Sequence, residues 1–100
     1  MNLKGRDLVS IRDLTKEEIF FILRKADEMI PFASGEKKTK ILEGKILATL
    51  FFEPSTRTKL SFETAMYRLG GKVIGFSEPS MTSIKKGETL ADTVKVVDSY

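Results

Sequence analysis

The first half of the chain contains one long amphipathic stretch. Its apolar side chains recur at the three- and four-residue spacing of a helix face, at Ile19, Phe20, Ile22, Leu23, Ala26, Met29 and Ile30. Thr15 precedes the stretch and Glu18 follows three residues later, which is the form of a capping box. Gly35, after the last apolar position, is typical of a helix end. The pattern predicts a helix that begins at Thr15 and ends before Gly35, with its apolar face packed as plain scaffold.

The middle of the chain has a strand, helix and strand pattern. Residues 45–52 form a nearly unbroken apolar run, which predicts a strand buried on both faces, as in a parallel sheet. Residues 73–76 form a second, shorter run. Between the two runs a helix is predicted to end at Gly70-Gly71, and its core positions are Leu60, Phe62, Ala65, Met66 and Leu69. Residues 45–76 therefore have the length of one βαβ unit.

The last quarter of the chain is predicted to be a long loop followed by a helix. Residues 77–87 are polar and contain Pro79 and Gly87. From residue 88 the helical spacing returns, with Leu90, Val94 and Val97 expected to point inward. Two strands, with three helices around them, make a sheet that is small for a doubly wound domain. We therefore expect an α/β fold, a parallel sheet flanked by helices, that is incomplete at its C-terminal end.

Length and composition narrow the class of protein. One hundred residues are enough for one hydrophobic core, so a second domain is not expected. Hydrophobic residues make up 41% and charged residues 31%, as in soluble globular chains. No apolar run approaches the roughly 20 residues that cross a bilayer, and the first residues lack the apolar stretch of a signal peptide. We expect a cytoplasmic protein without a membrane partner.

The residues that are missing exclude several chemistries. The chain has no cysteine and no histidine, which removes the disulfide frame, the thiolate nucleophile, the commonest general base and the usual zinc ligands. The net charge of +3 is spread along the chain, whereas nucleic-acid binding needs more concentrated charge. We therefore expect no cofactor, no metal and no nucleic acid, and chemistry that depends on hydroxyls, cations and backbone dipoles.

The most informative segment lies between the first predicted strand and its helix. Ser55, Thr56 and Thr58 supply three hydroxyls and Arg57 one guanidinium, beside the unpaired amides of a helix start. Such a place favours anions, and an arginine fork suits phosphate oxygens. Serine and threonine are also ordinary N-caps, so plain capping is the alternative. Arginine in a first turn opposes the helix dipole, however, and this favours an anion site.

Other charged residues carry a weaker signal. Neither nucleotide-binding glycine pattern is present, which favours a small phosphorylated ligand. Lys85 and Lys86 are either a solvated pair in a polar loop or part of a site. Glu53 is expected to pair with a cation and hold the loop, and Lys59 and Arg68 are expected to be solvated.

Three segments of the sequence resemble the aspartate carbamoyltransferases, in the first part of the carbamoyl-phosphate-binding domain of the catalytic chain. They are residues 51–66, residues 69–71 and residues 83–93. The Ser-Thr-Arg-Thr stretch also occurs in ornithine carbamoyltransferases, whereas the Lys-Lys-Gly-Glu-Thr loop points to aspartate as the acceptor. The resemblance implies that residues 1–100 are part of that domain and that the aspartate-binding domain is absent from this chain.

The resemblance implies transfer of the carbamoyl group of carbamoyl phosphate to L-aspartate, an early step of pyrimidine synthesis. It also implies roles for the residues that match the family motifs. Ser55, Thr56, Arg57 and Thr58 would bind the phosphate, Ser83 and Lys86 would reach the neighbouring subunit's site, and Glu53 would hold two domains in their closed arrangement. Arg57, Thr58 and Lys86 would take part in catalysis. A catalytic homotrimer, with regulatory chains in some members, and an inactive isolated 100-residue chain are expected.

Two other functions stay open at this point. The acceptor could be ornithine or another amine, or the chain could be a non-catalytic phosphate-binding module if 100 residues are the whole protein. A nucleic-acid-binding domain is favoured by the isoelectric point of about 9.2 alone.

Overall fold

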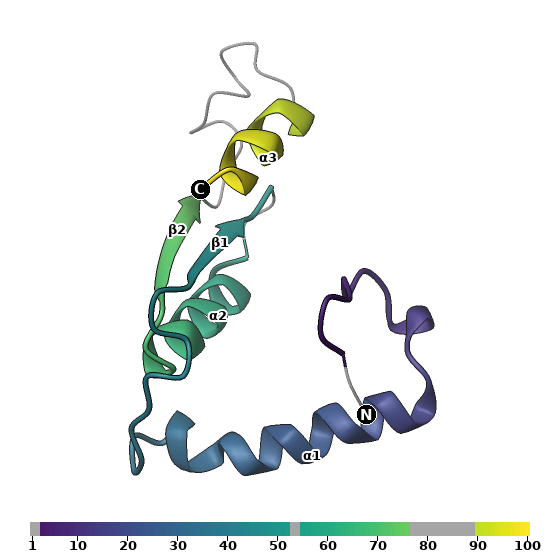
Figure 1. Cartoon of the computed structure of the whole chain (residues 1–100), viewed down its shortest axis with the longest axis vertical. Helices are drawn as coiled ribbons and strands as arrows, with labels where there is room; N and C mark the ends of the chain where they lie inside the picture. Colours follow the sequence, from purple (N-terminus) through teal and green to yellow (C-terminus); the bar gives the residue numbers. More distant parts are fainter. Residues whose placement is uncertain (1–2, 53–54, 77–89) are drawn as a thin grey trace. The chain divides into compact units, whose positions relative to one another are not determined.

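The computed structural model describes residues 3–52, 55–76 and 90–100 (Figure 1). The chain divides into two compact units, Met1–Lys37 and Lys38–Tyr100, where its length had suggested a single core. The first unit contains the short 3-10 helix η1 (Ile11–Asp13) and the helix α1 (Lys16–Ala33). The second contains, in chain order, β1 (Ile46–Leu50), α2 (Thr56–Arg68), β2 (Lys72–Phe76) and α3 (Leu90–Asp98). None of the described helices is long and apolar enough to span a bilayer.

The start of α1 confirms the predicted capping box. The Glu18 amide donates to Thr15 Oγ1 at 3.1 Å, and the Thr15 amide donates to Glu18 Oε1 at 2.8 Å. Both hydrogen bonds satisfy amides that the helix itself leaves unpaired.

The predicted packing of the apolar face of α1 is wrong for the described residues. Phe20, Leu23 and Ile30 are 49%, 54% and 60% exposed. The one buried residue of α1 is Glu18, which is also held by the guanidinium of Arg6. Within this unit the helix is accompanied by a short N-terminal segment, which is too small to cover a full apolar face.

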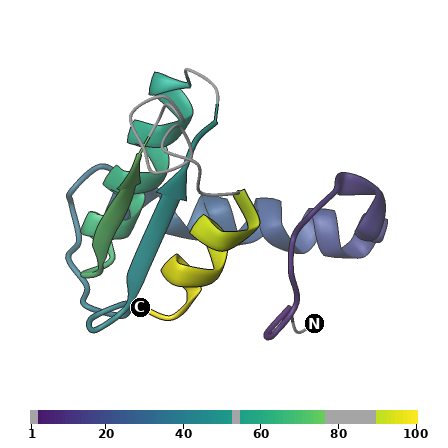
Figure 2. The same ribbon diagram turned by 90° about the horizontal axis from the view of Figure 1, so that it is seen from above.

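The second unit contains the predicted βαβ arrangement. The strands β1 and β2 are parallel, with a register that runs from Ile46 opposite Lys72 to Leu50 opposite Phe76. Figure 2 shows the two arrows side by side and pointing the same way. The helix α2 connects them and packs against both. This confirms the predicted α/β class and its parallel pair.

The strand β1 is not buried on both faces, which corrects the expectation for residues 45–52. Ile46 is exposed, and Leu47, Ala48 and Leu50 are half-buried. The most buried residue of β1 is its single polar one, Thr49, at 4% exposure. Burial on both faces requires a covering layer on each, and the exposure of Ile46 means that this cover is incomplete in the described residues.

The buried faces of α2 and α3 also differ from the prediction. In α2, Met66 is buried as predicted, whereas Leu60 and Phe62 are exposed and Glu63 is half-buried. In α3, Val94 is exposed and Thr93 is buried in its place. In each helix a polar residue is less exposed than the apolar residue next to it: Glu63 beside Phe62, and Thr93 beside Val94. The buried face of each helix is therefore rotated from its purely hydrophobic face.

The end of α2 is fixed by the predicted glycine stop. Gly70 adopts a φ of +90°, a left-handed conformation that favours glycine. A Cβ atom there would also lie 2.7 Å from the Lys40 backbone. The glycine therefore permits both the turn after α2 and the close passage of the chain that leads to β1.

Candidate functional site

The helix α2 begins just beyond the carboxyl end of β1. The strand ends at Leu50, and α2 starts at Thr56 with Ser55 as its N-cap. In open α/β sheets ligands bind at this edge, where the unpaired amides and the dipole of a helix start favour anions. The segment predicted to bind an anion therefore lies at the start of a helix that follows a parallel strand.

The side chain of Ser55 is not used for capping. Its φ and ψ are −146° and 61°, and its hydroxyl makes no capping hydrogen bond. The plain capping alternative is therefore wrong for Ser55. The first turn of α2 contains no acidic residue, so the positive end of the dipole is left without a neutralising side chain in that turn.

Three further predicted ligands follow on the first turn. Thr56, Arg57 and Thr58 are all exposed at the surface of α2. Among the residues that the structure describes, no ion pair holds the Arg57 guanidinium. Arginine at the positive end of a helix is unfavourable without an anion. Ser55, Thr56, Arg57 and Thr58 thus follow one another at the start of α2, where Ser55 makes no capping bond and no described carboxylate pairs with Arg57.

Lys59, one residue farther along α2, has different surroundings. Its Nζ atom lies 2.7 Å from Glu63 Oε2, one helical turn away, and the two side chains are 22% and 18% exposed. The expectation that Lys59 is solvated is therefore wrong. Arg68, in the last turn, is exposed as predicted.

Glu63 joins α2 to the sheet. Its Oε2 atom accepts a hydrogen bond from Lys59 at 2.7 Å and another from the Thr49 hydroxyl at 2.9 Å. The bond from Lys59 and, after it, the bond from Thr49 lower the pKa of Glu63 below its ordinary value. Glu63 is therefore held as a carboxylate between a cation and a buried hydroxyl.

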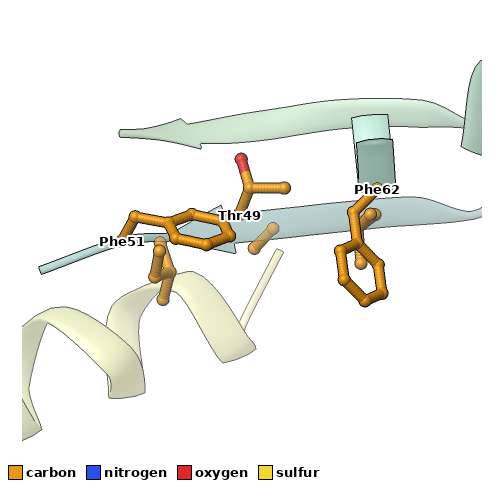
Figure 3. Close-up of a pocket in the computed structure, with 6 residues that line it drawn as sticks. Thr49, Phe51 and Phe62 are labelled. Atoms are coloured by element: carbon orange, nitrogen blue, oxygen red, sulfur yellow. The ribbon is translucent and has the colours of Figure 1, made fainter. Parts of the chain in front are cut away.

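A cavity of about 250 Å³ lies along β1, and its mostly apolar lining differs from the polar start of α2. Figure 3 shows Thr49 between the rings of Phe51 and Phe62, which also line it. The remaining lining residues are Leu47, Ala48 and Leu50. Apolar walls with a single hydroxyl do not suit an anion, so the first turn of α2 stays the candidate site.

Several predicted site residues lie outside the described part of the chain. These are Glu53, Ser83, Lys85 and Lys86. Among the described residues, no cluster of three acidic, histidine or cysteine side chains could hold a metal ion. The structure therefore places residues 55–58 at the start of α2, and the ligand roles of these residues and of the loop residues both stay predictions.

The sequence interpretation missed two polar residues beside the site, Thr49 and Glu63. Each carried a signal. Thr49 is the one hydroxyl in the apolar run of residues 46–52, and Glu63 follows Lys59 by four residues, which is the spacing of a helical ion pair.

Comparison with known proteins gives consistent matches. The family model described as aspartate/ornithine carbamoyltransferase, carbamoyl-P binding domain, matches residues 6–100. The aspartate carbamoyltransferase catalytic subunit of Thermococcus kodakarensis is 59% identical over 100 residues, which are all of this chain and 32% of that protein.

Solved structures agree with the sequence matches. The catalytic subunit of M. jannaschii aspartate transcarbamoylase superposes with a TM-score of 0.84 at 53% identity, over 93% of this chain and 31% of that one. Aspartate transcarbamoylase from Trypanosoma cruzi, in complex with carbamoyl phosphate and aspartate, gives 0.87 at 41% identity, over 98% of this chain and 32% of that one. The chain spans about a third of the length of these relatives.

Proposed function

The chain belongs to the aspartate/ornithine carbamoyltransferase family, and we propose on this premise that residues 1–100 are part of a carbamoyl-phosphate-binding domain. The full-length protein would transfer the carbamoyl group of carbamoyl phosphate to L-aspartate, giving N-carbamoyl-L-aspartate and phosphate. The observation that carries this proposal is the first turn of α2, where the Ser55 hydroxyl makes no capping bond, no residue is acidic, and no described carboxylate pairs with Arg57. The identity of 59% to an aspartate carbamoyltransferase supports aspartate as the acceptor.

The proposed reaction balances without a covalent enzyme intermediate. The aspartate amine attacks the carbamoyl carbon, and the bond from that carbon to the phosphate oxygen breaks. The electron pair of that bond leaves with the phosphate, which takes up the proton that the amine loses. Negative charge therefore builds on the phosphate, and donors fixed around it lower the barrier. Holding both substrates together also removes the entropy cost of their encounter.

Each residue of the first turn has a role in this proposal. Ser55, Thr56, Arg57 and Thr58 hold the phosphate oxygens, and Arg57 stabilises the charge as the phosphate leaves. Thr58 also lies near the carbamoyl oxygen. Their support is the helix start after β1, which supplies amides and a positive dipole end at the same place.

The proposal also covers three residues outside the described part of the chain, the assembly of the protein and its location. Ser83 and Lys86 would complete a neighbouring subunit's site, with Lys86 in a catalytic role, and Glu53 would hold two domains closed. A homotrimer and a cytoplasmic location belong to the same proposal. Measuring the mass of the full-length protein in solution tests the trimer, and cell fractionation tests the location.

The acceptor is tested by an assay of the full-length protein with carbamoyl phosphate and either L-aspartate or L-ornithine. Phosphate release with aspartate, and none above background with ornithine, is expected. Turnover with ornithine alone would replace the proposed acceptor. Binding of carbamoyl phosphate without turnover of either amine would leave a non-catalytic phosphate-binding module as the function.

A further inference from the structure

Three polar side chains connect α2 to β1 beneath the candidate site. The hydroxyl of Thr49, itself 4% exposed, donates to Glu63 Oε2 at 2.9 Å and lies 3.4 Å from the Ile74 carbonyl oxygen of β2. Glu63 Oε2 in turn accepts from Lys59 at 2.7 Å. We call Thr49, Lys59 and Glu63 the anchoring triad. It touches both strands and the helix between them.

The triad also reaches the N-cap of α2. The Lys59 amide donates to the Ser55 carbonyl oxygen at 3.0 Å, which is the hydrogen bond that closes the first turn. Its side chain then bonds Glu63, which bonds Thr49. Lys59 therefore contacts both ends of this path, with its backbone amide on the proposed phosphate ligand Ser55 and its side chain on Glu63, which accepts from the buried Thr49.

Apolar packing alone would hold α2 less specifically. Leu60 and Phe62, the large apolar side chains of its first half, are exposed by 54% and 57%. Replacing a buried ion pair with apolar residues is often neutral for stability. The hydrogen bond between Thr49 and Glu63 is directional, and it joins β1 to the helix that carries Arg57.

The triad also separates the two cations of the first turn. Glu63 neutralises Lys59, whereas the structure describes no carboxylate paired with Arg57. Without Glu63, Lys59 would be a second unpaired cation in the same turn. The carboxylate therefore leaves Arg57 as the cation available to an anion at the helix start.

We propose that Thr49, Lys59 and Glu63 are positioning residues, which set the first turn of α2 so that its donors converge on the phosphate of carbamoyl phosphate. This inference rests on the proposed function. In this proposal the three residues need no contact with the substrate. They act through the orientation of Ser55, Arg57 and Thr58.

The test compares the steady-state kinetics of the full-length protein with those of two variants of nearly unchanged side-chain shape. Thr49→Val removes the hydroxyl donor, and Glu63→Gln removes the negative charge. Each is expected to raise the KM for carbamoyl phosphate and to lower kcat, on the order of tenfold to a hundredfold in kcat/KM, as small misplacements of reacting groups do. Thr49→Ser, which keeps the hydroxyl, is expected to restore most of the loss.

A matched control is available in α1. Lys25 Nζ and Glu28 Oε2 form an exposed ion pair at 2.9 Å. Glu28→Gln removes a carboxylate from an ion pair, as Glu63→Gln does, but in the other unit, and is expected to leave kcat and KM unchanged.

The outcomes distinguish a positioning role of the anchoring triad from a purely stabilising role. Thermal melting of every variant ensures that kinetics are measured well below its transition. Unchanged kcat and KM in folded Thr49→Val and Glu63→Gln, with lowered melting temperatures, would overturn the positioning role and leave the proposed function intact. If instead the unaltered protein neither bound carbamoyl phosphate nor turned over, the proposed function would fail and this inference with it.

Discussion

Two cations in the first turn of α2 carry the same charge in different surroundings. Lys59 is paired with Glu63 at 2.7 Å, whereas Arg57 is exposed and is not paired with any described carboxylate. A cation near a helix N-terminus is unfavourable by itself. The pairing of Lys59 removes that penalty, and a bound phosphate would remove it for Arg57.

This difference leads to a prediction for Arg57→Ala in the full-length protein. Removing a preorganised cation from a site where negative charge develops costs about 3 kcal/mol of barrier, which is roughly a hundredfold or more in kcat. Phosphate release at saturating substrate measures it. Near-normal kcat would contradict the catalytic role of Arg57.

Gly75 is a second residue whose surroundings explain its identity. It pairs with Thr49 in the register of β1 and β2 and has a φ of +152°. A Cβ atom there would overlap the carbonyl oxygen and the hydroxyl of Thr49. The glycine lets the backbone of β2 approach the anchoring triad closely.

We predict that Gly75→Ala lowers the free energy of unfolding by roughly 2 to 4 kcal/mol, because it combines backbone strain with overlap. Urea denaturation of the full-length protein measures it. Gly44→Ala is the matched control, since Gly44 also has a positive φ, of +83°, but an added Cβ would meet nothing within 4 Å. The control is expected to cost about 1 to 2 kcal/mol. Equal costs for the two variants would contradict the overlap.

At the scale of elements, the start of α1 is held by one carboxylate. Glu18 accepts from the Thr15 amide at 2.8 Å and also from the guanidinium of Arg6, which in turn donates to the Asp13 carbonyl oxygen at 3.1 Å. The Thr15 amide, and after it Arg6, lower the pKa of Glu18 below its ordinary value. The carboxylate therefore joins the N-terminal segment, η1 and α1.

The lowered pKa predicts a pH dependence of stability. The stabilisation from ionised Glu18 is fully present above the pKa of an unfolded glutamate, about 4.3, and is lost as the pH falls through the lower folded pKa. Unfolding of the full-length protein and of Glu18→Gln, compared from neutral to acidic pH, should give a difference that shrinks with acid.

The control for that comparison is Glu17→Gln, which removes an exposed carboxylate from the same turn. We expect the pH profile of Glu17→Gln to follow the unaltered protein closely. A stability difference for Glu18→Gln that stayed constant through the acidic range would contradict the linkage to Glu18.

The sequence predicted where elements begin more accurately than which faces they bury. The capping box at Thr15 and Glu18 is a local pattern, so the start of α1 was predictable. The buried face of α2 depends on Thr49, which lies in another element and pairs with Glu63. Hydrophobic spacing alone assigns charged residues to the surface, and this is why Lys59 was predicted to be solvated.

At the scale of the whole molecule, the chain spans only part of the length of its relatives. Residues 6–100 match the carbamoyl-phosphate-binding domain, whereas the chain covers about a third of the relatives reported above. Some apolar residues of α1 and β1 are exposed. This agrees with a chain that spans about a third of its relatives, because both faces of a full doubly wound sheet are covered. The fold class was predictable because it depends on local patterns along the chain, whereas face burial was not, because it depends on contacts between elements. The anion site and the acceptor-binding residues stay predictions.

The central claim, that the first turn of α2 binds phosphate, is tested most directly by calorimetric titration of the full-length protein with carbamoyl phosphate. Arg57→Ala is compared with Arg68→Ala, which removes the same charge from the last turn of the same helix. We predict that Arg68→Ala binds as the unaltered protein does and that Arg57→Ala binds at least tenfold more weakly, the loss of about 1.4 kcal/mol or more expected for a charge-assisted contact. Equal affinity of Arg57→Ala and the unaltered protein would contradict the claim.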